Sequence, residues 1–521
     1  MLILLTGAAS DLGRALATEL ATEGHQLRLV DAEAVDAGER CEPWIADLTD
    51  SAAMWRALRG VDAVVHTGEA PANVPGAVPG NVSTDGEARA VFLLDYYTRG
   101  THVLFKASVE AGVRRFVYGS TLDLFRPYAD DLYISEMWRP LPTPDIEPMA
   151  RYLGELTCRE FARDYLVGIT ALRLGTITLE EDVVGDTPDL TWLDRRDAVC
   201  AFQGALQRDT ADNPNWSRRW GLFHVCATPP NPKYISDRAA QVFEPQHNFS
   251  AAWAAAEHSA SLSRPWAKAE SMPSSNSGFN SGAAKKKVLF LGASGLIGPF
   301  LTPGLESEYE LSLADVKPHP DGIPVEQVDV TDYAQVLSVA EGHDAIMNYT
   351  VVRSDADLSF HVNVRGAWNV MRAAAELGIP KVLHSGPEYV RPYYDHEFDI
   401  DNPPHAPGTG WYGTTKMLSR EICRIFARTY GTVTPCYLFN GLGAAPTEAV
   451  MGADFAPFTI VWEDLQHACR LALEIEELPN NYEEFNLHSH LGQGKFSIER
   501  AQRILGYEPT QDWARFYRRP T

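Results

Sequence analysis

The sequence predicts an α/β protein in which two doubly wound parallel-sheet domains follow one another along the chain. Two observations support this prediction: short β-branched runs alternate with amphipathic helical stretches, and the second half repeats the motif order of the first. Strands that alternate with helices form βαβ units, whose parallel sheet is covered on both faces. In the second half the strand candidates are "VLFLG", "LSLAD", "AIMNYT" and "VLHSG".

The internal repeat joins several pairs of similar segments that occur in the same order in both halves. "LILLTGAASDLGRAL" at 2–16 matches "VLFLGASGLIGPFL" at 288–301, and "EAGVRRFVYGS" at 110–120 matches "ELGIPKVLHSG" at 376–386. A period of this length is far too long for a solenoid. It therefore indicates a duplicated domain.

A stretch between the two halves predicts a linker. Residues 270–287 are rich in Ser, Gly and Asn and offer too little apolar surface to fold. We expect domains at 1–255 and 287–521, joined by a flexible linker at 256–286. The Ala-rich segment just before the linker adds a short helix to the first domain in this prediction.

Charge and composition exclude several classes of function. The net charge is −24, and such a field repels phosphate backbones and anionic lipid, so we expect neither a nucleic-acid nor a membrane partner. No apolar run approaches the roughly 20 residues that span a bilayer, and the opening "MLILL" indicates a strand instead of a signal peptide. The seven cysteines contain no Cys-x-x-Cys, so no disulfide framework or metal site is predicted. We expect a cytoplasmic protein.

A glycine loop in the second half has the spacing of a dinucleotide-binding turn. Gly292, Gly295 and Gly298 follow a predicted strand and open a helix, with Leu296 and Ile297 between the last two glycines. Glycine is needed there because the chain turns tightly and its N–H groups approach a pyrophosphate at the helix N-terminus. The alternative is a glycine turn in another kind of α/β fold.

Acidic residues follow this loop at the ends of later strands. Asp315 lies about as far downstream as an acid that bonds the adenosine ribose. An acid there disfavours a 2′-phosphate, so the predicted cofactor is NAD, with NADP less favoured. Asp329 and Val330, in "DVTD", are expected beside the adenine ring.

The first half keeps this pattern less completely. Gly7, Gly13, Asp31 and Asp47 stand at the corresponding positions, but Ser10 replaces the middle glycine. Because serine is small enough to preserve the turn, these residues remain candidates for binding a dinucleotide. Weakened or lost binding is the alternative.

Tyr412 and Lys416 lie in "WYGTTK", four residues apart, which places them on one face of a helix. A free tyrosine titrates near pH 10 and is a poor base at neutral pH. A nearby ammonium favours the phenolate and lowers that pKa. By spacing alone, the pair is either a proton-transfer device or two ordinary surface residues.

Taken together, these motifs resemble the extended short-chain dehydrogenase/reductase family, the NAD-dependent epimerase/dehydratase group. The resemblance covers nearly all of both halves and includes the Asn363-x-x-Gly366 helix. It implies two tandem Rossmann-like domains, each with a small C-terminal substrate-binding portion, and it places Asn363 in the cofactor site. It also implies that Tyr412 removes a hydroxyl proton from the substrate while Lys416 holds the nicotinamide ribose.

The two halves depart from the family pattern at complementary places. The family's substrate-bonding Ser or Thr would fall at Pro387 or the glycine before it, and Ser385 lies one or two residues early. Either Ser385 takes over this role or the second half has lost an orienting donor. In the first half Thr121 has the expected position, but Tyr152 is followed by Leu156 instead of lysine. We therefore expect the first half to be catalytically poor.

The expected substrate is small. Only about 60 residues separate the strand after the tyrosine helix from the closing helix in each half, which is little material for holding a nucleotide-sugar. The opening of the chain is also similar to uronate dehydrogenases. We expect NAD-dependent oxidation or reduction of a sugar, sugar acid or polyol in the second half. Sugar or nucleotide-sugar epimerisation or dehydration is the alternative reaction, and a catalytically silent dinucleotide-binding scaffold or sensor is the alternative of another class.

The family resemblance also implies a mode of association. Its extended members commonly dimerise through a four-helix bundle that includes the tyrosine-bearing helix. Two joined copies therefore predict an intramolecular pseudo-dimer, and further homo-oligomerisation stays open.

Overall fold

The computed structural model divides into two compact units, Met1–Ala284 and Lys285–Thr521. Much of the predicted linker, residues 260–284, lies outside the described residues. The described residues are 1–36, 38–74, 86–229, 232–235, 238–259, 285–387, 407–439, 441–445, 447, 459–489, 496–510 and 519. Among the described helices, none is long and apolar enough to cross a membrane.

The first unit is built on a parallel sheet with the strand order β3-β2-β1-β4-β5-β6-β9. Its strands are β1 (Leu2–Thr6), β2 (Gln26–Asp31), β3 (Cys41–Ile45), β4 (Ala63–His66), β5 (Arg115–Thr121), β6 (Gly168–Leu174) and β9 (Trp220–Val225). A small second sheet pairs β7 (Thr176–Thr178) with β8 (Trp192–Asp194).

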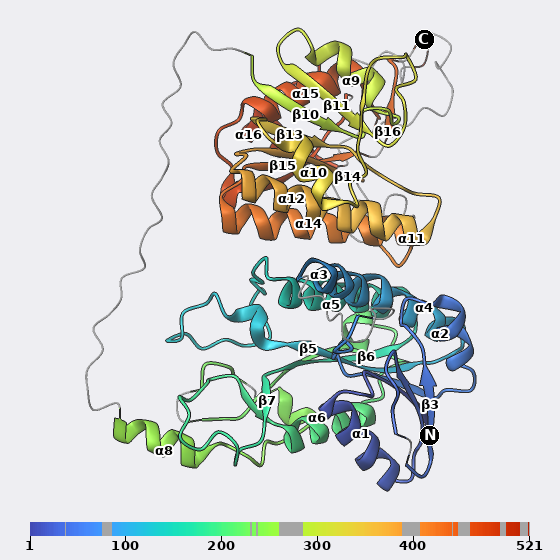
Figure 1. Ribbon diagram of the computed structural model, residues 1–521, viewed down its shortest axis with the longest axis vertical. Helices are drawn as coiled ribbons and strands as arrows, with labels where there is room; N and C mark the ends of the chain where they lie inside the picture. The colour runs from blue at the N-terminus through green and yellow to red at the C-terminus, as the bar shows by residue number, and fades with distance from the viewer. Residues whose placement is uncertain are drawn as a thin grey trace. The chain divides into compact units, whose positions relative to one another are not determined.

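Helices cover both faces of this sheet (Figure 1). On one face lie α1 (Asp11–Thr22) and α6 (Arg195–Gln207), whose apolar residues share a core with the strands. The other helices are α2 (Ser51–Ala57), α3 (Gly86–Asp95), α4 (Thr101–Glu110), α5 (Ile146–Asp164), α7 (Trp216–Arg219) and α8 (Ser250–Ser259). Of these, α2, α4 and α5 pack on the face opposite α1. The helix α8 begins in the Ala-rich segment where the sequence predicts one.

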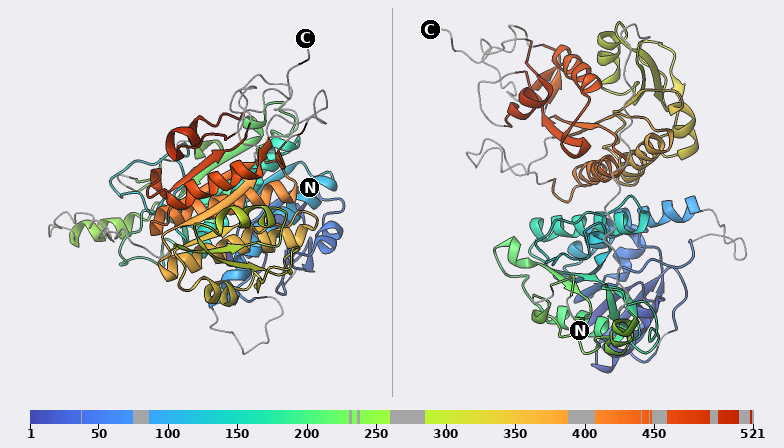
Figure 2. Two further views of the ribbon diagram at one scale, coloured as in Figure 1. Left: turned by 90° about the horizontal axis from the view of Figure 1, so that it is seen from above. Right: turned by 90° about the vertical axis from the view of Figure 1, so that its left-hand side faces the viewer.

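The second unit repeats the same topology, with the strand order β12-β11-β10-β13-β14-β15-β18. Its strands are β10 (Lys287–Leu291), β11 (Glu310–Asp315), β12 (Glu326–Gln327), β13 (Ala345–Asn348), β14 (Val382–Pro387), β15 (Thr434–Phe439) and β18 (Tyr482–Asn486), with β16 (Gly441–Gly443) and β17 (Thr459–Val461) paired separately. Its helices are α9 (Gly298–Leu305), α10 (Tyr333–Ala340), α11 (Ala356–Ser359), α12 (Gly366–Leu377), α14 (Trp411–Tyr430), α15 (Trp462–Glu474) and α16 (Glu499–Leu505). The predicted fold class, two tandem doubly wound parallel-sheet domains, is confirmed (Figure 2).

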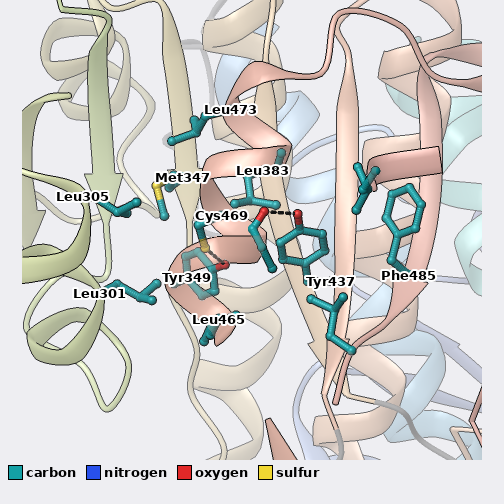
Figure 3. Packing of buried hydrophobic residues seen from close by; sticks show 14 of the residues in the cluster. Leu301, Leu305, Met347, Tyr349, Leu383, Tyr437, Leu465, Cys469, Leu473 and Phe485 are labelled. Atoms are coloured by element: carbon teal, nitrogen blue, oxygen red, sulfur yellow. Dashed lines mark hydrogen bonds between the residues drawn. The ribbon is translucent and has the colours of Figure 1, made fainter. Parts of the chain in front are cut away.

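The core of the second unit fixes which helices lie on which face. Leu301 of α9 and Leu465 of α15 pack with Met347 and Leu383 of the sheet (Figure 3). A hydrogen bond of 3.2 Å joins the Tyr349 hydroxyl to the Cys469 thiol of α15. The helices α10, α12 and α14 cover the opposite face. The tyrosine-bearing helix α14 therefore lies on the other side of the sheet from α9 and α15.

Candidate active site

The glycine loop between β10 and α9 has the backbone geometry that its spacing predicts. Gly292 has a φ of +85°, and a Cβ there would lie 2.8 Å from the Tyr349 carbonyl carbon. A Cβ on Gly298 would lie 1.9 Å from the Ala293 carbonyl oxygen. Both positions therefore require glycine, and the bare backbone leaves the start of α9 open to approach by a ligand.

Asp315 stands at the end of β11 and faces the glycine loop. Its carboxylate accepts N–H bonds of 3.0 Å from Ser294, in the loop, and of 3.0 Å from Lys317. The Ser294 hydroxyl in turn donates to the Lys317 carbonyl at 2.8 Å. These bonds tie the loop to the strand end and fix the carboxylate at the edge of a cavity.

This cavity has a volume of about 200 Å³ and opens between the glycine loop and the ends of β11 and β13. Most of the predicted cofactor residues of the second half line it: Gly292, Gly295, Leu296, Ile297, Asp315, Asp329 and Val330. A crevice at the carboxyl ends of parallel strands, where the strand order reverses, is the usual place for a dinucleotide in such sheets. The residues present therefore fit a dinucleotide.

Asn363 lies next to the site, and its predicted role in binding the cofactor stays a prediction. It is buried and is not among the residues that line the cavity. Its amide exchanges two hydrogen bonds of 2.9 Å with the backbone of Val352 and donates a third, also 2.9 Å, to the Thr415 hydroxyl. Asn363 thus ties the loop after β13 to α14, a contact that the sequence does not predict.

Tyr412 and Lys416 lie on α14, as their spacing predicts. The Tyr412 side chain is half-buried, and Lys416 is only 2% exposed. Burial, with smaller contributions from Arg420 and Arg353, lowers the pKa of Lys416 to about 8. At neutral pH most of Lys416 is therefore still protonated, and its charge is lost as the pH rises past 8.

Arg353 completes this end of the site, although no sequence motif marks it. It follows β13 by five residues and lines the same cavity as the glycine loop. Its guanidinium carbon lies 5.1 Å from the centroid of the Tyr412 ring, within range of a cation–π contact. The only hint in the sequence is a position just beyond a predicted strand at the ligand-binding edge of the sheet.

Ser385 lies in β14, where the sequence predicts a strand. The neighbouring His384 contacts the Ser419 hydroxyl of α14 at 3.1 Å. Because successive side chains of a strand alternate between faces, Ser385 points to the face that α9 and α15 cover, together with Leu383. Its role in orienting a substrate stays a prediction.

The first half keeps the turn of the glycine loop through Ser10. The Ser10 hydroxyl donates to the Gly7 carbonyl at 2.7 Å and accepts the Gly13 N–H at 2.9 Å, and the residue caps α1. Asp31 accepts the Ala9 N–H at 2.9 Å, as Asp315 does from Ser294 in the second half. The predicted turn is therefore present in both halves.

The space between this first loop and the strand-end acids Asp31 and Asp47 is nearly filled. A cavity of only about 10 Å³ lies there, lined by Asp31, Asp47 and two aromatic side chains, Phe92 and Tyr96. Tyr96 precedes Gly100 by four residues, as Val362 precedes Gly366 in the second half. Two aromatic rings therefore occupy the volume that stays open in the second half.

A separate polar cavity of about 450 Å³ lies at the strand ends of the first half. Thr121 lines it and accepts the Asp123 N–H at 3.1 Å. Arg151, from α5, also lines it and pairs with Glu147 at 2.8 Å and with Glu69 at 3.4 Å. Oppositely charged groups in this cavity thus already neutralise one another in part.

Beneath this cavity the first half replaces the Tyr-x-x-x-Lys chemistry with packing and an ion pair. Tyr152 and Leu156 are both buried in α5, each 7% exposed. Glu155, three residues after Tyr152 in α5, pairs with Arg173 of β6 at 2.6 Å. It also accepts a hydrogen bond of 2.8 Å from the Ser120 hydroxyl. This ion pair is not among the features predicted from the sequence. An arginine inside a predicted buried strand was the available signal, because a buried charge needs a partner.

Comparisons with known proteins give a separate family match for each of the two units. Residues 7–155 match the NAD(P)H-binding family model, and residues 288–455 match the NAD dependent epimerase/dehydratase family. The uncharacterized protein YtbQ of Bacillus subtilis is 31% identical over 157 residues, 27% of this chain and 62% of that protein. The NAD-dependent glucose-6-phosphate dehydrogenase of Haloferax volcanii is 25% identical over 225 residues, 40% of this chain and 80% of that protein.

A uronate dehydrogenase of Pseudomonas syringae pv. tomato is 32% identical over 176 residues, 33% of this chain and 58% of that protein. The chain thus spans about three fifths of the length of this relative and of YtbQ. The two family matches fall on the two units with the same sheet topology, and both lie over a glycine loop. The chain therefore contains two tandem Rossmann-like domains, of which the first matches an NAD(P)H-binding family and the second matches the NAD dependent epimerase/dehydratase family.

Proposed function

We propose that the second half is an NAD-dependent oxidoreductase that acts on a hydroxyl or carbonyl group of a small carbohydrate. The observation that carries the proposal is the joint presence of Tyr412 and Lys416 on α14 and an open cavity lined by the glycine loop and Asp315. The names of the relatives, a glucose-6-phosphate dehydrogenase and a uronate dehydrogenase, support a carbohydrate substrate.

In this proposal the second half holds the cofactor through its backbone and one acid. The N–H groups at the start of α9 bind the pyrophosphate, and the Asp315 carboxylate accepts hydrogen bonds from the adenosine ribose. Because a carboxylate repels a 2′-phosphate, Asp315 favours NAD over NADP. When bound, the nicotinamide supplies the acceptor or donor of a hydride.

The proton is handled by the chain itself. In oxidation, the Tyr412 phenolate takes the proton of the substrate hydroxyl as the carbon–oxygen double bond forms, and in reduction the phenol returns it. The Lys416 ammonium favours the phenolate, because an opposite charge nearby stabilises the ionised form. Since the pKa of Lys416 is about 8, this support is present at neutral pH and fades above pH 8.

Tyr412→Phe tests the assignment of the base. We expect turnover to fall by roughly 10²- to 10⁴-fold, because phenylalanine keeps the ring but removes the proton acceptor. The dissociation constant of NAD should stay within about twofold, since the glycine loop and Asp315 are untouched. Steady-state formation of NADH and a calorimetric titration with NAD measure the two quantities. Unchanged turnover would refute the role of Tyr412.

Epimerisation is the second candidate, favoured by the match of residues 288–455 to the epimerase/dehydratase family. It begins with the same proton removal at Tyr412 but returns the hydride to the substrate. Net NADH should therefore accumulate in oxidation and not in epimerisation. Chromatography of the sugar products separates the two reactions.

A further inference from the structure

Arg353 stands between the cofactor cavity and the tyrosine helix. Its guanidinium carbon is 5.1 Å from the Tyr412 ring centroid, and its backbone carbonyl accepts the Trp411 indole N–H at 2.9 Å. This hydrogen bond anchors the Arg353 backbone to the first residue of α14. The side chain is exposed, so a ligand in the cavity can reach it.

The Arg353 guanidinium has no carboxylate paired with it among the described residues. Many other arginines of the protein are paired. Lys416, the neighbouring cation on α14, is buried and has no carboxylate partner among the described residues either. Two cations thus lie near Tyr412, while the Asp355 carboxylate, two residues after Arg353, accepts the Leu358 N–H at 2.8 Å and caps α11.

The acids of the cavity lie at its other end. Asp315 ends β11 and Asp329 follows β12, and in the sheet both strands lie on one side of β10. Arg353 follows β13, which lies on the other side of β10. Lys317 also lines the cavity on the side of Asp315 and Asp329, so that side carries both charges. Arg353 is the charged lining residue on the side of Tyr412, and its charge favours an anionic group there.

Among the described residues of the first half, no cation stands at the corresponding position. Five residues after β4 stands Pro71, at the position that Arg353 takes after β13. Arg151, the arginine of the first-half cavity, is already paired with Glu69 and Glu147. Among the described residues, an unpaired cation beside the tyrosine of the Tyr-x-x-x-Lys motif is therefore found in the second half, where Arg353 lies beside Tyr412.

We propose that Arg353 binds an acidic group of the substrate, a carboxylate or a phosphate, and so determines that the second half selects anionic carbohydrates. A guanidinium offers paired N–H donors that match either group, and two parallel bonds fix orientation as well as position. The substrate hydroxyl is then held at Tyr412 without a hydroxyl donor from β14. This inference rests on the proposed function and names its substrate class.

The test uses the full chain with NAD and three matched sugars: glucose, glucuronate and glucose 6-phosphate. The unaltered protein should prefer one of the two anions, and that choice distinguishes a carboxylate from a phosphate. Arg353→Gln should lower kcat/KM for that anion by roughly 10- to 100-fold, mainly through KM, since a hydrogen bond to a charged group is lost. The kcat/KM for glucose should change by less than about twofold. Arg353→Lys should restore part of the loss because it restores the charge.

Arg500→Gln is the matched control, because this exposed arginine pairs with Glu483 at 2.8 Å on the surface and should leave every value unchanged. Two outcomes overturn the proposal. One is an Arg353→Gln protein with the original preference for anions. The other is an equal loss with all three sugars together with weaker NAD binding, which would assign Arg353 to the cofactor phosphates.

The failure of the proposed function is a separate result. If none of the three sugars is turned over, the NAD-saturated protein is titrated with glucuronate and with glucose 6-phosphate by calorimetry. Binding that Arg353→Gln weakens supports the anion site even in a protein that does not oxidise these sugars. Absent binding, or binding that the substitution leaves unchanged, overturns it.

Discussion

Burial of Lys416 lowers the stability of the folded protein, although the same residue is proposed to assist catalysis. Its side chain is 2% exposed, and burial lowers its pKa from 10.5 to about 8. A pKa that is lower in the folded state means that folding opposes the charged form. The ammonium that is proposed to assist Tyr412 therefore costs stability at neutral pH.

Lys416→Met should remove this cost. The shift from 10.5 to about 8 corresponds to roughly 3 kcal/mol as an upper limit, so the variant should unfold at higher denaturant at pH 7. The cost is fully present below pH 8 and disappears as the pH rises from 8 to 10.5, because the folded lysine is then already neutral. The gain over the unaltered protein should therefore shrink across that window. Urea unfolding without cofactor at pH 7, 8.5 and 10 measures it, and a gain independent of pH would contradict the explanation.

Single residues also mark the limit of what the sequence can predict about the site. Gly292 and Asp315 could be placed because backbone strain and strand-end acids leave local patterns. Arg353 could not, because its role depends on the approach of a loop and a helix that are about 60 residues apart in the chain. Ser385 and Asn363 have the expected sequence positions, and their roles stay predictions. The three hydrogen bonds of Asn363 depend on a loop and a helix that the sequence does not place together.

At the scale of elements, strands and helix ends follow closely from the sequence. Ala367, Val370, Met371 and Ala374 recur at helical spacing and are buried in α12, and the helix ends at Gly378, whose φ of +67° suits glycine. What precedes α12 was not predicted. A π-helical turn leads into α12, and another leads into α4 in the first half. Periodicity does not reveal such turns, because a single π-helical turn is too short a stretch to define its own period.

The contact between α5 and β6 contains the buried pair of Glu155 and Arg173. Arg173→Met should destabilise the first unit by roughly 3–5 kcal/mol, because Glu155 is left buried without its partner. Glu155→Leu combined with Arg173→Met should recover most of this loss, since the second half holds a threonine and a leucine at these places. The midpoints of urea unfolding, followed by fluorescence, measure both effects.

A surface pair provides the control for this contact. Arg114 pairs with Asp212, and both side chains are well exposed, so Arg114→Met should cost less than about 1 kcal/mol. If Arg173→Met and Arg114→Met lowered the free energy of unfolding equally, burial would not determine how much these ion pairs contribute to stability. A double variant no more stable than Arg173→Met alone would mean that the ion pair itself contributes strongly.

At the scale of the whole molecule, the two duplicated units share one topology but differ in the cavities beside their glycine loops. Both units have the same seven-strand order and the same glycine turn. Between that turn and the acid at the end of the next strand, the second has an open cavity of about 200 Å³ and the first has one of about 10 Å³. A polar cavity of about 450 Å³ borders the other side of the first turn at Ser10. The repeat could be predicted from matching motifs, but the difference in cavities could not, because it depends on how aromatic side chains fill space. The pseudo-dimer of the two halves stays a prediction.

This difference predicts that one chain binds one dinucleotide. A calorimetric titration of the full chain with NAD should give a stoichiometry near one, because Phe92 and Tyr96 fill the volume that an adenosine would need in the first half. Asp315→Asn should weaken binding by roughly tenfold, since a charged acceptor for the ribose is lost. Asp31→Asn is the matched change in the first half and should leave the dissociation constant unchanged. Two equivalents of NAD per chain, or equal effects of the two substitutions, would show that the first half also binds the cofactor.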